Sequence, residues 1–213
     1  MKNSIIIPLL FVVTLNFSCA QNPENKVNTP KEMFFTPELF VDELQIPWGF
    51  TFLPDNSLLI TEKEGKLIHF NKGKKSIIGN VPEVYNRGQG GLLDIALHPK
   101  YKENGWIYLT YASVEGKEKG GHTALMRAKL KDNSLTEQQV LYKATPNTTK
   151  GQHFGSRIAF DKNGFLYFSI GERGDRDTNP QDIKRDGGKI YRLHDDGRIP
   201  ADNPFQDVKG AKT

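Results

Sequence analysis

The feature that most constrains the fold is a pattern of short apolar strands and turns that occurs three times along the chain. In each unit a strand, a turn and a second strand are followed by a loop and a third strand. We expect the strands at residues 49–53, 58–62 and 66–70, then 92–97, 106–111 and 123–130, and finally 157–160, 165–170 and 189–193. Proline or Asn-Gly separates the first two strands of each unit, as tight turns require.

The spacing of the units indicates how they pack. Equivalent turn residues lie 45 positions apart between Pro54 and Pro99, and 62 apart between Pro99 and Asp161. Repeats of this size made of short strands are typical of propeller blades. One small sheet cannot cover both its faces, so it stacks on its neighbours around an axis. We therefore predict an all-β propeller with about three blades present, to which residues 76–79 and 139–141 could add fourth strands.

This number of blades raises a difficulty, because propellers close with about four to eight blades. An open half-ring exposes the apolar flanks of its first and last blades. The chain is then either a fragment or closes by self-association. Residues 210–213 contain no covering strand, which favours a fragment.

Composition excludes several classes of protein. The net charge is only +4 and the basic residues are scattered, whereas nucleic-acid binders concentrate theirs in a patch. We therefore expect no nucleic-acid partner. Cys19 is the only cysteine, which excludes an intrachain disulfide and a cysteine-based zinc site.

The N-terminus has the pattern of an export signal. We interpret residues 1–18 as a signal peptide of the lipoprotein type, 19–33 as a polar tether and 34–213 as the propeller domain. Cleavage before Cys19 would leave that cysteine for lipidation, whereas cleavage after Ala20 would release the domain. The lone cysteine at this place favours lipidation. We expect an exported protein, periplasmic or anchored to the bacterial envelope, with a lipid anchor as its only contact with the membrane.

Two glycine-rich loops carry candidate functional residues. His153 lies between Gly151 and Gly155 just before the third unit, and an imidazole can accept a proton near neutral pH. Gln89 lies among glycines before the second unit, which could project its amide into the mouth of the propeller. The alternatives are a surface histidine in a turn and a flexible glycine turn.

An acidic loop follows the third unit's second strand. Asp175, Asp177 and Asn179 imitate the start of a calcium loop, but Pro180 occupies the place where the sharp turn needs glycine. Nearby arginines and lysines offset the charge. We favour a solvated loop and expect no metal ligands in this chain. Ser156 lacks the strand–Gly-x-Ser-x-Gly–helix context of a hydrolase nucleophile.

Several segments together carry a family resemblance. They occur in order as GGLLDIALHP at 90–99, QHFGSR at 152–157, GERG at 171–174, GKIYRL at 188–193 and DGRIPADNPF at 196–205. Over about residues 40–205 the chain resembles the soluble, PQQ-dependent aldose sugar dehydrogenases of the glucose/sorbosone dehydrogenase family.

The resemblance implies a six-bladed propeller, here incomplete, that oxidises an aldose at its C1 hydroxyl to the lactone. Electrons would pass to pyrroloquinoline quinone (PQQ), held with calcium, and then to an external acceptor. His153 falls at the family's general base, and Gln89, Gln152 and Glu172 at positions that contact the sugar. Arg157 is expected to be a structural partner of the loop.

The resemblance also shows what the 213 residues lack. The family's His-Arg-Asn-Pro-Gln-Gly segment does not appear, and most cofactor contacts are expected beyond Thr213. We therefore predict that these residues alone do not turn over sugar. The alternatives are a non-catalytic propeller lipoprotein that binds carbohydrate or protein, and a lactonase-type propeller.

Overall fold

The computed structural model describes residues 35–212. The expected signal peptide, Cys19 and the tether to residue 33 lie outside the described residues. Contacts divide the chain into two units, Met1–Leu39 and Phe40–Thr213, and the fold below is that of the second unit. Within residues 35–212, no helix has the length and apolar character needed to cross a membrane.

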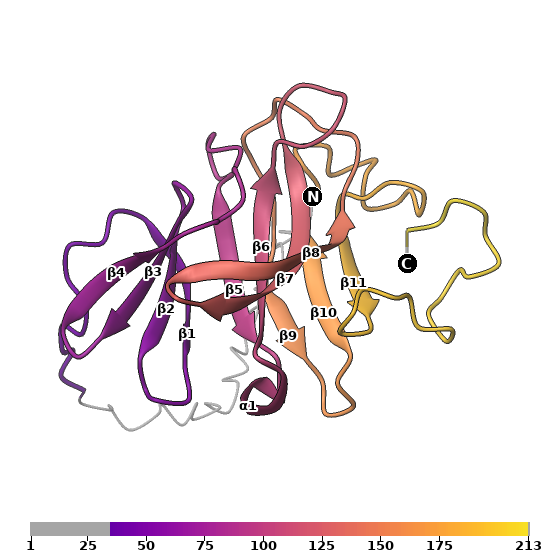
Figure 1. Ribbon diagram of the computed structural model, residues 1–213. Helices are drawn as coiled ribbons and strands as arrows, with labels where there is room; N and C mark the ends of the chain where they lie inside the picture. Colours follow the sequence, from indigo (N-terminus) through magenta and orange to yellow (C-terminus); the bar gives the residue numbers. More distant parts are fainter. Residues whose placement is uncertain (1–34, 213) are drawn as a thin grey trace, which may run out of the picture. The chain divides into compact units, whose positions relative to one another are not determined.

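The second unit is built from three antiparallel sheets that follow one another along the chain (Figure 1). The first contains β1 (Pro47–Phe52), β2 (Leu58–Glu62), β3 (Lys66–Asn71) and β4 (Lys74–Ile78). The second contains β5 (Leu92–Leu97), β6 (Trp106–Ser113), β7 (His122–Lys131) and β8 (Ser134–Lys143). The third contains β9 (Ile158–Phe160), β10 (Leu166–Ile170) and β11 (Lys189–Leu193).

Each expected unit therefore forms one sheet. The fourth strands anticipated in the first two units are present as β4 and β8, and β8 is much longer than residues 139–141. Two-residue turns at Lys72-Gly73 and Asp132-Asn133 join these strands to their neighbours, and all four residues have positive φ angles. Positive φ at both central positions gives the type I′ turn, whose twist matches that of the flanking strands.

A single helical turn, α1 (Tyr101–Asn104), occupies the connection between β5 and β6, where only a turn was expected. Gly105 ends it in the left-handed region at φ 71°, and its N–H donates to the carbonyl of Tyr101. Four residues are too few for a helical hydrophobic period, so the pattern of apolar residues could not indicate this element.

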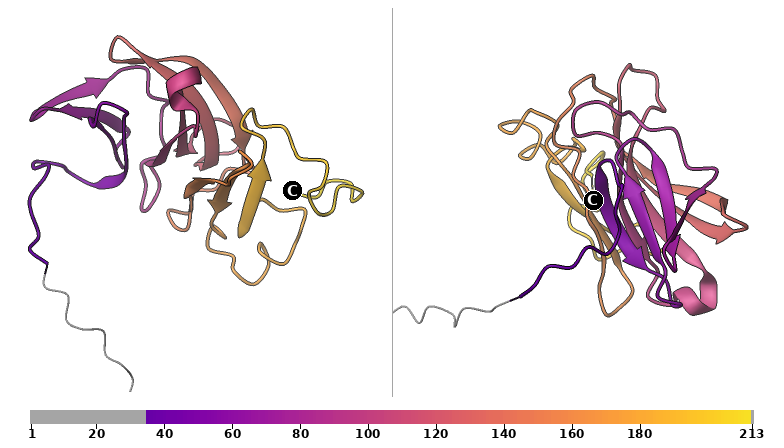
Figure 2. Two further views of the ribbon diagram at one scale, coloured as in Figure 1. Left: turned by 90° about the horizontal axis from the view of Figure 1, so that it is seen from below. Right: turned by 90° about the vertical axis from the view of Figure 1, so that its left-hand side faces the viewer.

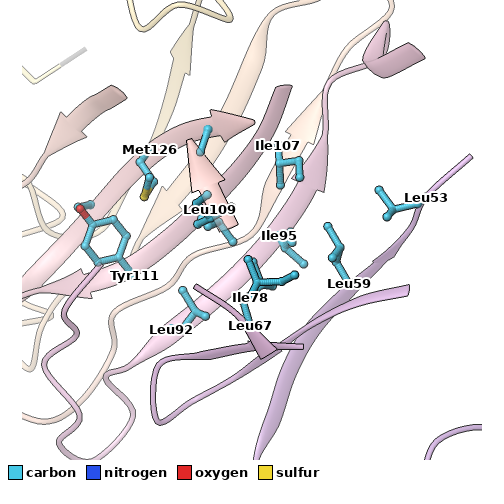
Figure 3. Close-up of a cluster of buried hydrophobic side chains, with 13 residues drawn as sticks. Leu53, Leu59, Leu67, Ile78, Leu92, Ile95, Ile107, Leu109, Tyr111 and Met126 are labelled. Carbon is cyan, nitrogen blue, oxygen red and sulfur yellow. The ribbon is translucent and has the colours of Figure 1, made fainter. Parts of the chain in front are cut away.

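The sheets pack face to face through two apolar clusters. The cluster between the first and second sheets is drawn in Figure 3 and includes Leu59, Leu67, Leu92 and Leu109, each fully buried. Burying one such side chain contributes about 1.5–3 kcal/mol. The cluster between the second and third sheets includes the buried side chains of Tyr108, Leu125, Phe168 and Tyr191.

Neighbouring sheets approach each other most closely at their first strands. β5 contacts β1 on one side and β9 on the other, and two views show the sheets side by side (Figure 2). At the outer flanks of the series, apolar side chains remain exposed: Phe50 and Phe52 on β1, and Ile190 on β11. This agrees with the expected exposure of the first and last blades.

Candidate active site

The site forms where a loop enters the third sheet. Residues 148–156, here called the histidine loop, lead into β9, while Glu172 and Arg173 follow β10. β9 and β10 are antiparallel, with Phe168 opposite Ile158, so the chain leaving β10 returns to the place where the loop enters β9. The hairpin thus brings His153 and Glu172 together although they are distant in sequence.

His153 and Glu172 are hydrogen-bonded through Nδ1 of the imidazole and Oε1 of the carboxylate. The other carboxylate oxygen, Oε2, accepts the backbone N–H groups of Gly174 and Asp175. Partial burial acts to raise the pKa of Glu172, but hydrogen bonds from His153, Asp175 and Gly174 outweigh it and hold that pKa below its usual range. An ionised carboxylate only accepts, so Nδ1 carries the proton and Nε2 presents a lone pair.

The imidazole is open to a ligand while its partner is covered. The side chain of His153 is 50% exposed and that of Glu172 18%. Both line a pocket of about 320 Å³, together with Gly174, Asp175, Arg176 and Asp177. The pair can therefore accept a proton from a hydroxyl group placed in this pocket.

Gln89 lies against the backbone of His153. Its side-chain Oε1 accepts the backbone N–H of His153 at 2.7 Å, and the backbone N–H of Gln89 donates to the carbonyl of Gly151 at 2.6 Å. A Cβ on Gly88 would lie 2.2 Å from that same carbonyl oxygen, so only glycine permits the approach. The structure thus places Gln89 against His153 but not among the residues that line the pocket, and its expected contact with sugar stays a prediction.

Gln152 is adjacent to the site but directed elsewhere. Its carbonyl accepts a hydrogen bond from Nη1 of Arg173. Its side-chain amide lies beside Gly174, where an added Cβ would be 2.4 Å from Nε2. Gln152 does not line the pocket around His153, and its expected contact with sugar stays a prediction.

Arg157 joins the end of the histidine loop to the other sheets. Its Nη1 donates to Oδ1 of Asp94 on β5 at 3.0 Å, and its guanidinium lies 4.6 Å from the ring centre of Trp48 on β1. The second oxygen of Asp94 accepts the N–H of Ile158 at 2.8 Å. These contacts are structural, in keeping with the role expected for Arg157.

Several carboxylates of the acidic loop have protein partners. Asp175 and Asp182 both form ion pairs with Arg185, and Asp186 accepts hydrogen bonds from two tyrosines and pairs with Lys212. Across residues 35–212, no three His, Cys, Asp or Glu side chains are grouped so as to hold a metal ion.

Arg173, for which the sequence predicted no role at the site, lies buried against the histidine loop. The available signal was its position: a charged pair, Glu172-Arg173, directly follows a buried strand and lies between Gly171 and Gly174. A charge at the end of a buried strand must find partners when the fold closes.

Comparison with known proteins identifies the family. The model described as Glucose / Sorbosone dehydrogenase matches residues 44–213. The chain belongs to this family. The resemblance inferred from the sequence motifs is therefore confirmed.

Several relatives of this family member align over most of its length. Aldose sugar dehydrogenase YliI of Escherichia coli is 39% identical over an alignment of 180 residues that covers 82% of this chain and 48% of the relative. The crystal structure of the soluble aldose sugar dehydrogenase from Escherichia coli, in the apo-form, superposes with a TM-score of 0.75 over 79% of this chain and 50% of that one, at 39% identity. The structure of the PQQ-bound form of aldose sugar dehydrogenase from Streptomyces coelicolor superposes with a TM-score of 0.67 at 32% identity. The match covers 79% of this chain and 49% of that one.

This chain thus spans about half the length of the curated relative it matches. Its antiparallel sheets correspond to part of the β-propeller found in PQQ-dependent dehydrogenases. The predicted fold class is confirmed.

Proposed function

We propose that the protein carrying this chain oxidises an aldose at its C1 hydroxyl to the lactone, with His153 as the general base. The observation that supports this most directly is the His153–Glu172 hydrogen bond beside a pocket. Nε2 would take the hydroxyl proton as the C1 hydrogen leaves with its electron pair as hydride. The carboxylate of Glu172 would stabilise the imidazolium that forms.

The sugar contacts are part of the proposal. Gln89 uses Oε1 to accept the N–H of His153, which leaves its amide N–H groups as donors for a sugar hydroxyl. Among the hydrogen bonds of residues 35–212, none has Nε2 of Gln89 as donor. Glu172 and Gln152 complete the proposed set, with Glu172 acting mainly through His153.

We propose PQQ as the electron acceptor, together with calcium, and an external acceptor that reoxidises the quinone. PQQ, when bound, supplies two-electron acceptance. The described residues suit only part of this role. PQQ carries three carboxylates, whereas the pocket at His153 offers one guanidinium, Arg176, against Glu172, Asp175 and Asp177. Cations that bind the quinone would have to come from sequence corresponding to the relatives' other half.

The function is tested with the whole protein encoded by the gene, supplied with PQQ, calcium and a panel of aldoses, while reduction of an electron-accepting dye is followed. We expect turnover that falls about 1,000-fold or more in His153→Ala. His69→Ala, on β3 away from the site, serves as the matched control and should retain activity. The 213 residues alone should give no turnover above the His153→Ala background.

Other outcomes point to the alternatives. Full dye reduction by His153→Ala would contradict the role of His153. Binding of sugar without dye reduction would favour a non-catalytic binding propeller. Lactone hydrolysis without quinone would favour a lactonase-type enzyme.

We also propose that the protein is exported and anchored through a lipid on Cys19. The support is the sequence pattern of residues 1–18 and the single cysteine that follows. Cell fractionation tests it: Cys19→Ala should move the protein from the membrane fraction to the soluble fraction. A wild-type protein already found free in the periplasm would favour cleavage after Ala20.

A further inference from the structure

Arg173 is the largest fully buried side chain of the described structure, with 1% of its surface exposed. Burying a guanidinium is costly unless its donors are satisfied. No carboxylate forms an ion pair with Arg173 among residues 35–212. Burial lowers the pKa of Arg173 to about 10, so the group is still charged at neutral pH. The fold thus retains a buried positive charge, and the groups that bind the guanidinium must offset the cost of burying it.

Those partners belong mainly to the histidine loop. Nη1 donates to the carbonyl of Gln152, and Nη2 donates to the carbonyl of Lys150 at 2.7 Å and to Oγ1 of Thr148 at 3.1 Å. Nη2 also reaches the carbonyl of Gly121, just before β7, at 3.3 Å. One guanidinium therefore ties alternate residues of the loop to the second sheet.

The guanidinium also contacts the residue that follows His153. Its central carbon lies 3.4 Å from the ring centre of Phe154, which is itself buried. Arg173 therefore contacts both chain neighbours of His153, Gln152 and Phe154. His153 itself has a φ angle of +54°, in the left-handed region that non-glycine residues seldom adopt. Such a conformation costs about 1 kcal/mol or more and persists only where the surroundings hold it.

We propose that Arg173 is a positioning residue for His153: by binding the carbonyls before it and the ring after it, Arg173 holds Nδ1 of His153 on Glu172. This rests on the proposed function, in which His153 is the base. Arg173 directly follows Glu172 in sequence, so one end of β10 supplies both the carboxylate that fixes the imidazole tautomer and the guanidinium that fixes the loop. Lysine could keep the charge, but its ammonium lacks the planar fork that reaches several carbonyls at once.

The test is the tautomer of His153, read by NMR of the whole protein labelled with ¹⁵N-histidine and assigned with His153→Ala. In wild type we expect the proton on Nδ1. In Arg173→Lys and Arg173→Gln we expect a mixture in which Nε2–H is populated, as in an unrestrained imidazole. Arg198→Lys is the matched control, because Arg198 is exposed and, within residues 35–212, its guanidinium pairs only with Asp196. It should leave the tautomer unchanged.

Activity gives a second readout. Both Arg173 variants should lose about 10- to 100-fold in kcat with less than about threefold change in KM, because a misplaced base slows the chemical step more than binding. A folded Arg173→Lys or Arg173→Gln variant that keeps the wild-type tautomer would overturn the proposal. If neither variant folds, Thr148→Val decides, since it removes one partner of Nη2: a shifted tautomer supports the proposal and an unchanged one overturns it.

These readouts separate the two proposals. The tautomer can be measured whether or not the protein oxidises sugar. An inactive wild type with an Nδ1–H tautomer that depends on Arg173 would refute the sugar oxidation while supporting the positioning role.

Discussion

His153 and Glu172 are 19 positions apart, yet Nδ1 of the first is hydrogen-bonded to Oε1 of the second. The β9–β10 hairpin brings them together, and two backbone amides hold the remaining oxygen of Glu172. A half-exposed histidine would otherwise rotate freely and populate both tautomers. The carboxylate selects the one whose Nε2 can accept a proton.

We expect Glu172→Gln to lower kcat for aldose oxidation about 100-fold, because a neutral amide can accept from Nδ1–H but cannot stabilise the imidazolium by its charge. Steady-state dye reduction by the whole protein measures this. Asp132→Asn, at the tip of the β7–β8 hairpin, removes a carboxylate away from the site and should have little effect. Equal activity of wild type and Glu172→Gln would contradict the prediction.

The buried His122 predicts how stability depends on pH. Burial, followed by the charge of Arg173, lowers the pKa of His122 from 6.5 to about 4. Between these values the unfolded chain binds the proton and the folded chain does not, so the free energy of unfolding falls as the pH falls. The free energy of unfolding falls by about 3 kcal/mol once the pH is below both pKa values. Above the pKa of His122 in the unfolded chain, this contribution to stability is fully present.

Denaturant unfolding at about pH 7 and about pH 4 measures the loss. His122→Asn should flatten the dependence, because Asn Oδ1 can replace the Nδ1 that accepts the N–H of Thr123 but does not titrate. Burial also lowers the pKa of His98. The free energy of unfolding of His122→Asn should therefore still fall slightly as the pH falls. Identical slopes for wild type and His122→Asn would show that His122 is not the group responsible.

Alanine substitutions at Gly171 and Gly164 distinguish the effect of steric contact from the effect of backbone strain. An added Cβ at Gly171 would lie 2.1 Å from the carbonyl oxygen of His153, whereas at Gly164 it would meet nothing within 4 Å but the φ angle is +84°. We expect Gly164→Ala to cost about 1 kcal/mol of stability and leave kcat unchanged. Gly171→Ala should displace the histidine loop and reduce kcat at least 10-fold, as about 1 Å of misplacement does. Dye reduction and thermal unfolding of both variants provide the measurement, and unchanged kcat in Gly171→Ala would count against this geometry.

Leu109 lies in the cluster between the first and second sheets and is completely buried. Leu109→Ala should lower the free energy of unfolding by about 2–5 kcal/mol, because lost burial and a residual cavity add. Ile77→Ala, on β4 with 59% of its surface exposed, should change it by less than about 0.5 kcal/mol. Urea unfolding measures both, and similar losses for the two variants would argue against a tight interface between the sheets.

The sequence predicted much of the fold because strands and tight turns leave local signals. The limits of β5 and β11 agree with those expected, since short apolar runs between turn residues define each strand. The third sheet has no fourth strand among residues 35–212, and the helical turn α1 was too short to leave a periodic pattern. The glycines around His153 and Gln89 likewise marked the loops that meet at the site.

By itself, then, the sequence determined the order of the strands, the repeated sheets and the candidate base at His153, because each depends on residues close together in the chain. The tertiary structure alone decided the partners of that base. The contacts of His153 with Gln89 and Glu172 join positions 64 and 19 residues apart, and the guanidinium of Arg173 reaches back 52 residues to Gly121. Contacts of that range form only when packed sheets bring loops together, so no local pattern of residue types can specify them.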